Sequence, residues 1–178
     1  KARKASVTSA LAALVTTRLP RQAMRKPNQA TCPHCPGEIQ PSPLPERMIG
    51  ADARFYLHAK LGGWGARGVG FMEERALAEY ERCFCRPESI HAACEDYRAS
   101  AGIDLEHDRA SRAAGQRIAC DLLALWGERG VIHALFDPPT LWRAQCAGRF
   151  QGHAVPSGHY IPEELPDETA QALRDFFA

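Results

Sequence analysis

The sequence predicts an α/β protein in which a run of helices is followed by a terminal β-α-β-α unit. Three observations support this class. Apolar residues recur at helical spacing between residues 55 and 116, they form short continuous runs after Cys120, and these runs alternate with further helical segments. With 178 residues, 45% of them apolar and 24% charged, the chain is long enough to bury a core.

Composition and charge exclude two classes of partner. No apolar run approaches the roughly 20 residues that span a bilayer, so we expect no membrane insertion. The 22 Lys and Arg residues nearly cancel the 21 Asp and Glu residues, so no broad basic surface is left to bind nucleic acid.

Seven cysteines without regular disulfide spacing are typical of a reducing cytoplasm. We expect no metal and no cofactor, and a homo-oligomer is left open.

The first part of the chain differs from the rest. Residues 1–48 hold eight Lys and Arg residues against two Glu, a net charge of +6, whereas residues 49–178 hold 14 cations against 19 anions, a net charge of −5. Seven prolines lie between Pro20 and Pro45. Together these features predict a loop-rich start in which residues 6–18 form one amphipathic helix. An organelle transit peptide is the alternative interpretation.

Four helices are predicted in the middle of the chain, over residues 55–64, 73–84, 87–101 and 105–116. The first is stopped by a glycine-rich end, and the third begins with Pro87, which suits the first turn of a helix. The second and third each place four side chains on one face: Ala76, Leu77, Tyr80 and Phe84 on one, and Ile90, Ala93, Cys94 and Tyr97 on the other.

After Cys120 the pattern becomes that of buried strands. Asp121–Gly127 is a short apolar run ended by glycine, and a second strand is predicted over residues 151–155. Between them a helix over residues 137–146 opens with two prolines, and a last helix over residues 166–177 is expected to turn Ala170, Leu173 and Phe176 inward. The order implies a parallel pair. Because two strands do not make a stable parallel sheet, we expect further strands elsewhere, and aggregation or a molten state for the chain alone.

From Gln40 onwards the sequence resembles the haloacetate dehalogenases, fluoroacetate dehalogenases above all, within the α/β-hydrolase superfamily. Six segments carry the resemblance: QPSPLPERMIG (40–50), YLHAKLGGW (56–64), CEDYRA (94–99), DLEHD (104–108), LALWG (123–127) and SGHYIPEELP (157–166). It implies an incomplete α/β-hydrolase fold with a helical cap at residues 40–117 and the C-terminal part of the core at residues 118–178. Residues 1–39 match nothing in that family.

The resemblance also implies a chemistry. In this family an Asp carboxylate displaces halide from a small haloacid to give an enzyme ester, and a histidine activates the water that hydrolyses the ester. His159 matches the catalytic histidine, while Tyr97 and Trp64 match positions that line the halide pocket. A departing halide needs such neutral donors in a site with little water.

Parts of the family pattern are missing from the sequence. It contains no His-Gly-Phe, no Gly-x-Asp-x-Gly and no Gly-x-Ser-x-Gly. The first Asp after residues 123–127 is Asp137, to which we assign no role. We therefore expect that this chain alone does not turn over haloacetate. The sharp onset of the match at Gln40 suggests that residues 1–39 come from a shifted reading frame or another source.

Alternative functions stay open. Cys32-Pro33-His34-Cys35 resembles the active-site motif of thioredoxin-like oxidoreductases, although Pro36-Gly37 follows where a helix is needed. The same cysteines with Cys83 and Cys85 could hold zinc. Within the superfamily an epoxide hydrolase is the second candidate, with Tyr97 as its best tyrosine, since Tyr56 and Tyr80 lack the matching context. A non-catalytic fragment is the third.

Overall fold

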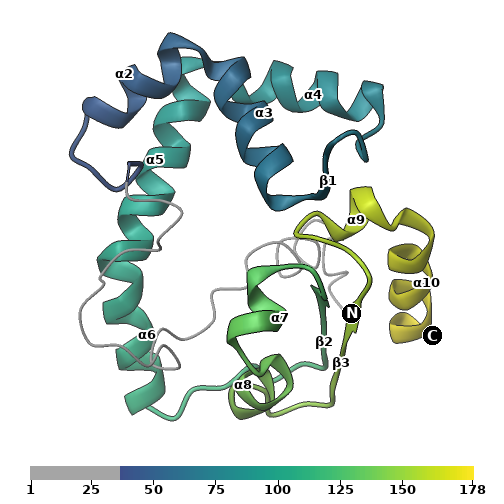
Figure 1. Ribbon diagram of the computed structural model, residues 1–178. Helices are drawn as coiled ribbons and strands as arrows, with labels where there is room; N and C mark the ends of the chain where they lie inside the picture. The colour runs from purple at the N-terminus through teal and green to yellow at the C-terminus, as the bar shows by residue number, and fades with distance from the viewer. Residues whose placement is uncertain (1–36) are drawn as a thin grey trace, which may run out of the picture.

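The computed structural model describes residues 37–178, in which a helical part is followed by a part that contains a pair of strands. The helical part consists of α2 (Leu44–Ala51), α3 (Ala53–Trp64), β1 (Ala66–Val69), α4 (Glu74–Phe84), α5 (Pro87–Ala101) and α6 (Ile103–Ala113). The strand part consists of β2 (Leu122–Gly127), α7 (Val131–Leu135), α8 (Pro138–Gln145), β3 (Phe150–Val155), α9 (Ile161–Glu164) and α10 (Pro166–Phe177). This order confirms the predicted α/β class (Figure 1).

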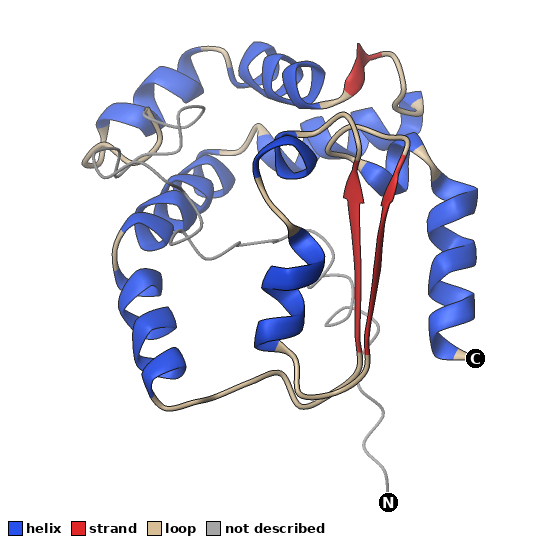
Figure 2. Ribbon diagram, turned by 60° about the horizontal axis from the view of Figure 1, so that its bottom comes forward, coloured by secondary structure: helices blue, strands red, loops and turns tan. Residues whose placement is uncertain are grey.

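The sheet formed by the described residues is the parallel pair of β2 and β3. Its register runs from Leu122 opposite Phe150 to Gly127 opposite Val155, and β1 lies outside it. Both strands therefore end at the same edge, which is where parallel sheets place their binding sites. Figures 1 and 2 show α8 and α10 on opposite sides of the pair.

Three apolar clusters form the core. The first joins α2 to α5 through Ile49, Ile90 and Cys94, and the second packs Leu57, Leu61 and Met72 around the end of α3. The third centres on Leu125, Val155 and Ile161 in the strand part. Tyr160, from the strand part, packs against the second cluster, so the two parts are in contact at the end of α3.

Helix ends follow the local chemistry of the chain. Asp52 accepts a hydrogen bond from the Phe55 backbone N–H at the start of α3, and α3 ends at Trp64 just before Gly65. A Cβ atom at Gly65 would lie 2.3 Å from the Phe71 ring, so a larger residue there would require that ring to move. The predicted helices over residues 73–84 and 87–101 are confirmed as α4 and α5.

Four elements were not predicted: α2, β1, α7 and α9. Proline enrichment around α2 indicated a loop, but Pro45 lies in the first turn, where proline lacks only a hydrogen bond that the helix does not make. The helix predicted over residues 105–116 is α6, which begins at Ile103 and ends at Ala113. The one predicted over residues 6–18 lies outside the described residues.

The predicted faces of α10 and α4 each need one addition or correction. On α10, Ala170, Leu173 and Phe176 are half-buried, and Thr169, which was not predicted, is buried, with its hydroxyl donating to the Leu165 carbonyl at 2.7 Å. On α4, Tyr80 is 40% exposed rather than inward, because its hydroxyl reaches Glu163 of α9. None of the helices in the described range combines the length and apolarity needed to cross a bilayer.

Candidate active site

His159 lies in the loop between β3 and α9, and the Glu164 carboxylate holds this loop on both sides of the histidine. The Gly158 N–H donates to Glu164 Oε2 at 2.9 Å, and the Tyr160 N–H donates to Glu164 Oε1 at 3.1 Å. Charge-assisted bonds of this kind are stronger than neutral ones. Glu164 therefore fixes the backbone from which the imidazole projects.

Backbone hydrogen bonds from the residues just after β2 hold the same loop. The Arg129 N–H donates to the Ser157 carbonyl at 3.1 Å, and the Glu128 N–H donates to the Val155 carbonyl at 2.8 Å. A Cβ atom at Gly127 would lie 1.9 Å from the Gly158 carbonyl oxygen, closer than any side chain allows. Only glycine at the end of β2 permits this approach.

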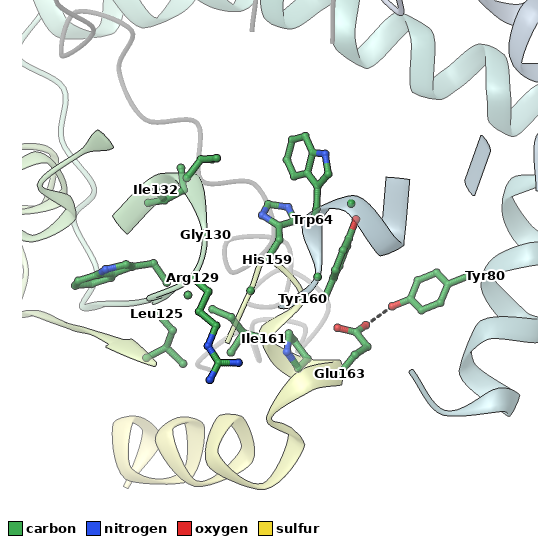
Figure 3. A pocket seen from close by; sticks show the side chains of 17 residues that line it. Trp64, Tyr80, Leu125, Arg129, Gly130, Ile132, His159, Tyr160, Ile161 and Glu163 are labelled. Carbon is green, nitrogen blue, oxygen red and sulfur yellow. Dashed lines mark hydrogen bonds between the residues drawn. The ribbon is translucent and has the colours of Figure 1, made fainter. Parts of the chain in front are cut away.

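The helical part contacts His159 through the last residue of α3. The His159 N–H donates to the Trp64 carbonyl at 3.0 Å. The indole of Trp64 and the imidazole of His159 meet edge to face, with ring centroids 4.8 Å apart at 76°. Figure 3 shows these two rings side by side, with Tyr160 next to them. The His159 ring also lies edge-on to the Tyr160 ring, at 5.1 Å between centroids.

The surroundings of His159 favour its neutral form. More than a third of the residue is exposed, yet the neighbouring rings remove water from the imidazole. This desolvation lowers the pKa of His159 below its ordinary value of 6.5, while the negative charge of Glu164 opposes the shift. A neutral imidazole at pH 7 can accept a proton from water, as a general base must.

Two cavities meet at His159 and Trp64. The larger one, of about 300 Å³, opens between the end of β2 and α9 and includes Arg129, Tyr80 and Glu163 in its wall (Figure 3). The smaller one, of about 220 Å³, lies between α3 and α5. All three residues singled out from the sequence, His159, Trp64 and Tyr97, line the smaller cavity.

The remaining wall of the smaller cavity contains residues that sequence reasoning did not select. They are Glu38, Ile49, Tyr56, Leu57, Lys60, Phe84, Ala93, Cys94 and Tyr160. Burial, together with the nearby charges of Glu163 and Glu164, raises the pKa of Tyr160 to about 12, so its hydroxyl keeps its proton. Burial also raises the pKa of the Cys94 thiol, which is therefore neutral. Tyr160 follows His159 directly in the sequence, and this adjacency was the available signal.

Other candidate groups have structural partners. Asp137, the nearest later Asp after β2, caps α8 by accepting from the Thr140 N–H at 3.3 Å. His133 accepts from Trp126 Nε1 at 3.2 Å. In the described residues, the side chains that come close enough to share a metal ion are Glu46, His91 and Glu95, and Arg98 already binds both carboxylates.

The cysteine hypotheses have no support in the described residues. Cys83 and Cys85, half of the proposed zinc set, are free thiols at the end of α4. Cys32 and Cys35, which the zinc site and the thioredoxin-like motif both require, lie outside the described residues.

The curated proteins that the chain resembles include a dehalogenase and an epoxide hydrolase. The chain is 37% identical over 140 residues to a fluoroacetate dehalogenase from Burkholderia sp., an alignment that covers 78% of this chain and 45% of the relative. It is 31% identical over 106 residues to a soluble epoxide hydrolase from Corynebacterium sp. strain C12, covering 59% of this chain and 34% of that one. The chain thus spans less than half the length of these relatives. No family model matches it.

Solved structures with similar folds are also hydrolases by their descriptions. ALR0039 from Nostoc sp. PCC 7120, assigned as an α/β hydrolase, superposes with a TM-score of 0.74 at 46% identity, over 79% of this chain and 47% of that chain. A Pseudomonas aeruginosa protein assigned as an epoxide hydrolase superposes with a TM-score of 0.69 at 36% identity, over 79% and 46%. The described fold is that of an incomplete α/β hydrolase with its helical cap.

Proposed function

The chain corresponds to a C-terminal segment of the fluoroacetate dehalogenase family of α/β hydrolases, and on this basis we propose that it supplies the cap and the histidine base of a haloacetate dehalogenase. In domain terms, residues 40–117 form the cap and residues 118–178 form the C-terminal part of the core. The attacking carboxylate comes from outside this sequence, which contains no Gly-x-Asp-x-Gly turn. The chain alone is inactive in this proposal.

The reaction proceeds in two steps. A carboxylate oxygen attacks the carbon that bears the halogen, a C–O bond forms, and the C–X bond breaks with its electron pair leaving as halide. Trp64 and Tyr97 line the cavity that receives the halide, and their N–H and O–H groups suit a developing anion. His159 then takes a proton from water, and the hydroxide attacks the ester carbonyl, which releases the 2-hydroxy acid and restores the carboxylate.

The observation that supports this proposal best is that one cavity contains all three side chains. They come from three distant points of the chain: the end of α3, the middle of α5 and the loop after β3. The lowered pKa of His159 adds support, since a base that is neutral at pH 7 is required. The haloacid specificity comes from the Burkholderia relative, whose name identifies it as a fluoroacetate dehalogenase.

The test restores the missing half. Residues 40–178 are joined to the N-terminal half of the Burkholderia relative, and fluoride release from fluoroacetate is measured with an ion-selective electrode. We expect release from the joined protein and none from the present chain. A folded joined protein that releases no fluoride, chloride or bromide from any haloacetate would overturn the proposal.

An epoxide hydrolase is the second candidate, favoured by one observation. Tyr56, Tyr97 and Tyr160 all line the smaller cavity, and a pair of tyrosines can protonate an epoxide oxygen. The Corynebacterium relative is named as an epoxide hydrolase. The joined protein separates the two functions: diol formation from a small aliphatic epoxide without halide release would favour this candidate, and inactivity on both substrates would favour a non-catalytic fragment.

We also propose that the chain works in the cytoplasm. Five cysteines in the described residues are free thiols, as is usual in a reducing compartment. Retention of these five thiols in protein isolated from cells, measured by alkylation and mass spectrometry, is the expected result.

A further inference from the structure

The Tyr80 hydroxyl joins the cap to α9. It belongs to α4 and donates a hydrogen bond to the Glu163 carboxylate, which lies 83 residues further along the chain. Figure 3 shows this bond in the wall of the larger cavity, which also contains His159. Burial, together with the hydrogen bond to Glu163, raises the pKa of Tyr80 to about 12, so the hydroxyl keeps its proton and remains a donor at pH 7.

Helix α9 transmits this contact to the histidine loop. The helix is a single turn, Ile161–Glu164, and its last two residues are both glutamates. Glu163 accepts from the cap, while Glu164 accepts from the Gly158 and Tyr160 N–H groups that flank the histidine, at 2.9 and 3.1 Å. Because adjacent residues of one turn are joined by a rigid peptide plane, a displacement of Glu163 also displaces Glu164 and the loop that it holds.

The cap also contacts the histidine loop directly. The Trp64 carbonyl accepts from the His159 N–H at 3.0 Å, and the Phe71 ring stacks on the Tyr160 ring with 5.8 Å between centroids and 14° between planes. With the bond from Tyr80, three separate segments of the cap contact the loop and the turn of helix that follows it. The position of the imidazole therefore depends on the cap as well as on the strand pair.

We propose that Tyr80 is a positioning residue for His159, and that it acts by holding α9 against the cap through Glu163. The inference deepens the proposed function and rests on it for the step that His159 performs. The attack that forms the ester needs no base, whereas hydrolysis of the ester needs the imidazole within hydrogen-bond distance of the attacking water. Loss of the Tyr80 hydroxyl should therefore slow hydrolysis of the ester and leave its formation unchanged.

The first experiment measures the two steps separately in the joined protein. Fluoride release in the first turnover reports ester formation, and quenched-flow mass spectrometry follows the loss of the carboxymethyl ester. Tyr80→Phe removes only the hydroxyl group. We expect its ester hydrolysis to be about tenfold slower, because small misplacements of a catalytic group are costly, while ester formation keeps its rate.

Variants of Glu163 test the route through α9. Glu163→Gln keeps a carbonyl oxygen that accepts from Tyr80 and should retain most of the hydrolysis rate, whereas Glu163→Leu should match Tyr80→Phe. Combining Tyr80→Phe with Glu163→Leu should cause no further loss, because both substitutions remove the same contact. Glu79→Leu is the matched control and should leave both steps unchanged, since the Glu79 carboxylate, also on α4, binds Arg82 of the same helix.

The second experiment needs no turnover and uses the present chain. The Trp64 ring, 4.8 Å from the His159 ring, shifts the His159 Cε1–H resonance by its ring current. We expect this shift to shrink in Tyr80→Phe and in Glu163→Leu and to persist in Glu79→Leu. Circular dichroism checks that each variant folds.

In folded variants, an unchanged His159 resonance would overturn the proposal, as would ester hydrolysis that slows no more than ester formation does. Unfolding of both Tyr80→Phe and Glu163→Leu would also overturn it, since the contact would then hold the fold rather than the base. If the resonance moves as expected while the joined protein forms no ester, the positioning role stands and the haloacetate function falls.

Discussion

The Glu164 carboxylate affects both the position and the pKa of His159. It accepts the N–H groups of Gly158 and Tyr160, which flank the histidine. Its negative charge also stabilises the imidazolium and so raises the pKa that burial lowers. One side chain therefore sets both the position and the basicity of the proposed base.

Glu164→Gln should lower the pKa of His159 further. The amide removes the negative charge, and it replaces one of the two acceptor oxygens with an NH2 donor, so one of the two flanking N–H groups loses its partner. An NMR titration that follows the His159 Cε1–H resonance gives the shift. Glu163→Gln is the control, because Glu163 also lies on α9 but its carboxylate accepts from the Tyr80 hydroxyl and not from the N–H groups that flank His159. Equal shifts in the two variants would contradict a specific role for Glu164.

The pH dependence of ester hydrolysis follows from the same pKa. Imidazolium cannot accept a proton, so the step slows once pH falls below the pKa of His159. Because burial lowers that pKa from 6.5, the joined protein should keep more than half of its deacylation rate at pH 6.5 and fall to half only at a lower pH. A stopped-flow pH series measures this, and a rate already halved above pH 6.5 would be the contrary result.

Part of this site could be predicted from the sequence. The segment around His159 and the aromatic residues Trp64 and Tyr97 were identified by resemblance, and the structure brings them to one cavity. Glu164 was not identified, because the second of two adjacent glutamates has the pattern of an ordinary surface residue. Its role comes from the backbone N–H groups of Gly158 and Tyr160 that the fold places beside it.

At the scale of elements, the end of β2 and the loop after β3 are interdependent. Gly127 closes the register of the strand pair opposite Val155, and it also touches the backbone of Ser157 and Gly158. The strand pair therefore fixes the position of the histidine loop, because no side chain lies between Gly127 and the loop backbone.

Gly127→Ala should displace the His159 loop and destabilise the protein by about 1–3 kcal/mol, the usual cost of overpacking. The added methyl group would lie 1.9 Å from the Gly158 oxygen and 2.6 Å from the Ser157 oxygen, and backbone atoms move less readily than side chains. Urea unfolding measures the loss, and the ring-current shift of His159 from Trp64 reports the displacement.

The matched control is Gly50→Ala in α2, where no atom lies within 4 Å of the new Cβ atom. This substitution should leave stability unchanged or raise it by up to about 1 kcal/mol, because alanine favours a helix more than glycine does. Equal losses at both positions would show that the contact at Gly127 has no special effect.

Helices were predicted correctly where the helical repeat of apolar residues extended over several turns, and were missed where the helix was too short to show one. The helix over residues 87–101 spans four turns, and α5 has those limits. The elements α7 and α9 have five and four residues, too few to show a helical repeat. Thr169 was missed on α10 because a threonine reads as polar, while its hydroxyl is satisfied inside its own helix.

For the whole molecule, the parallel pair is small for its class. Parallel sheets are normally covered on both faces and have several strands, whereas the described residues provide two. Next to this pair, α7 exposes Val131 at 44% and Leu135 at 63%. Free edges beside exposed apolar side chains favour association with further chains.

We therefore predict that the chain self-associates as its concentration rises, and that Val131→Lys with Leu135→Lys reduces this association. Sedimentation velocity over a concentration series measures the effect. Leu44→Lys with Met48→Lys, which changes two exposed apolar residues on α2 away from the sheet, should reduce association less. A present chain that stays monomeric throughout and melts in one sharp transition would contradict the prediction.

The central claim is that His159 completes, on an ester made by a carboxylate from outside this sequence, the hydrolysis that Trp64 and Tyr97 help to start. Mass spectrometry of the joined protein carrying His159→Asn, after exposure to fluoroacetate, tests it most directly. We predict that fluoride is released only once per active site and that the protein gains the mass of one carboxymethyl group on its attacking carboxylate. Continued turnover by His159→Asn, or fluoride release without a trapped ester, would contradict the account.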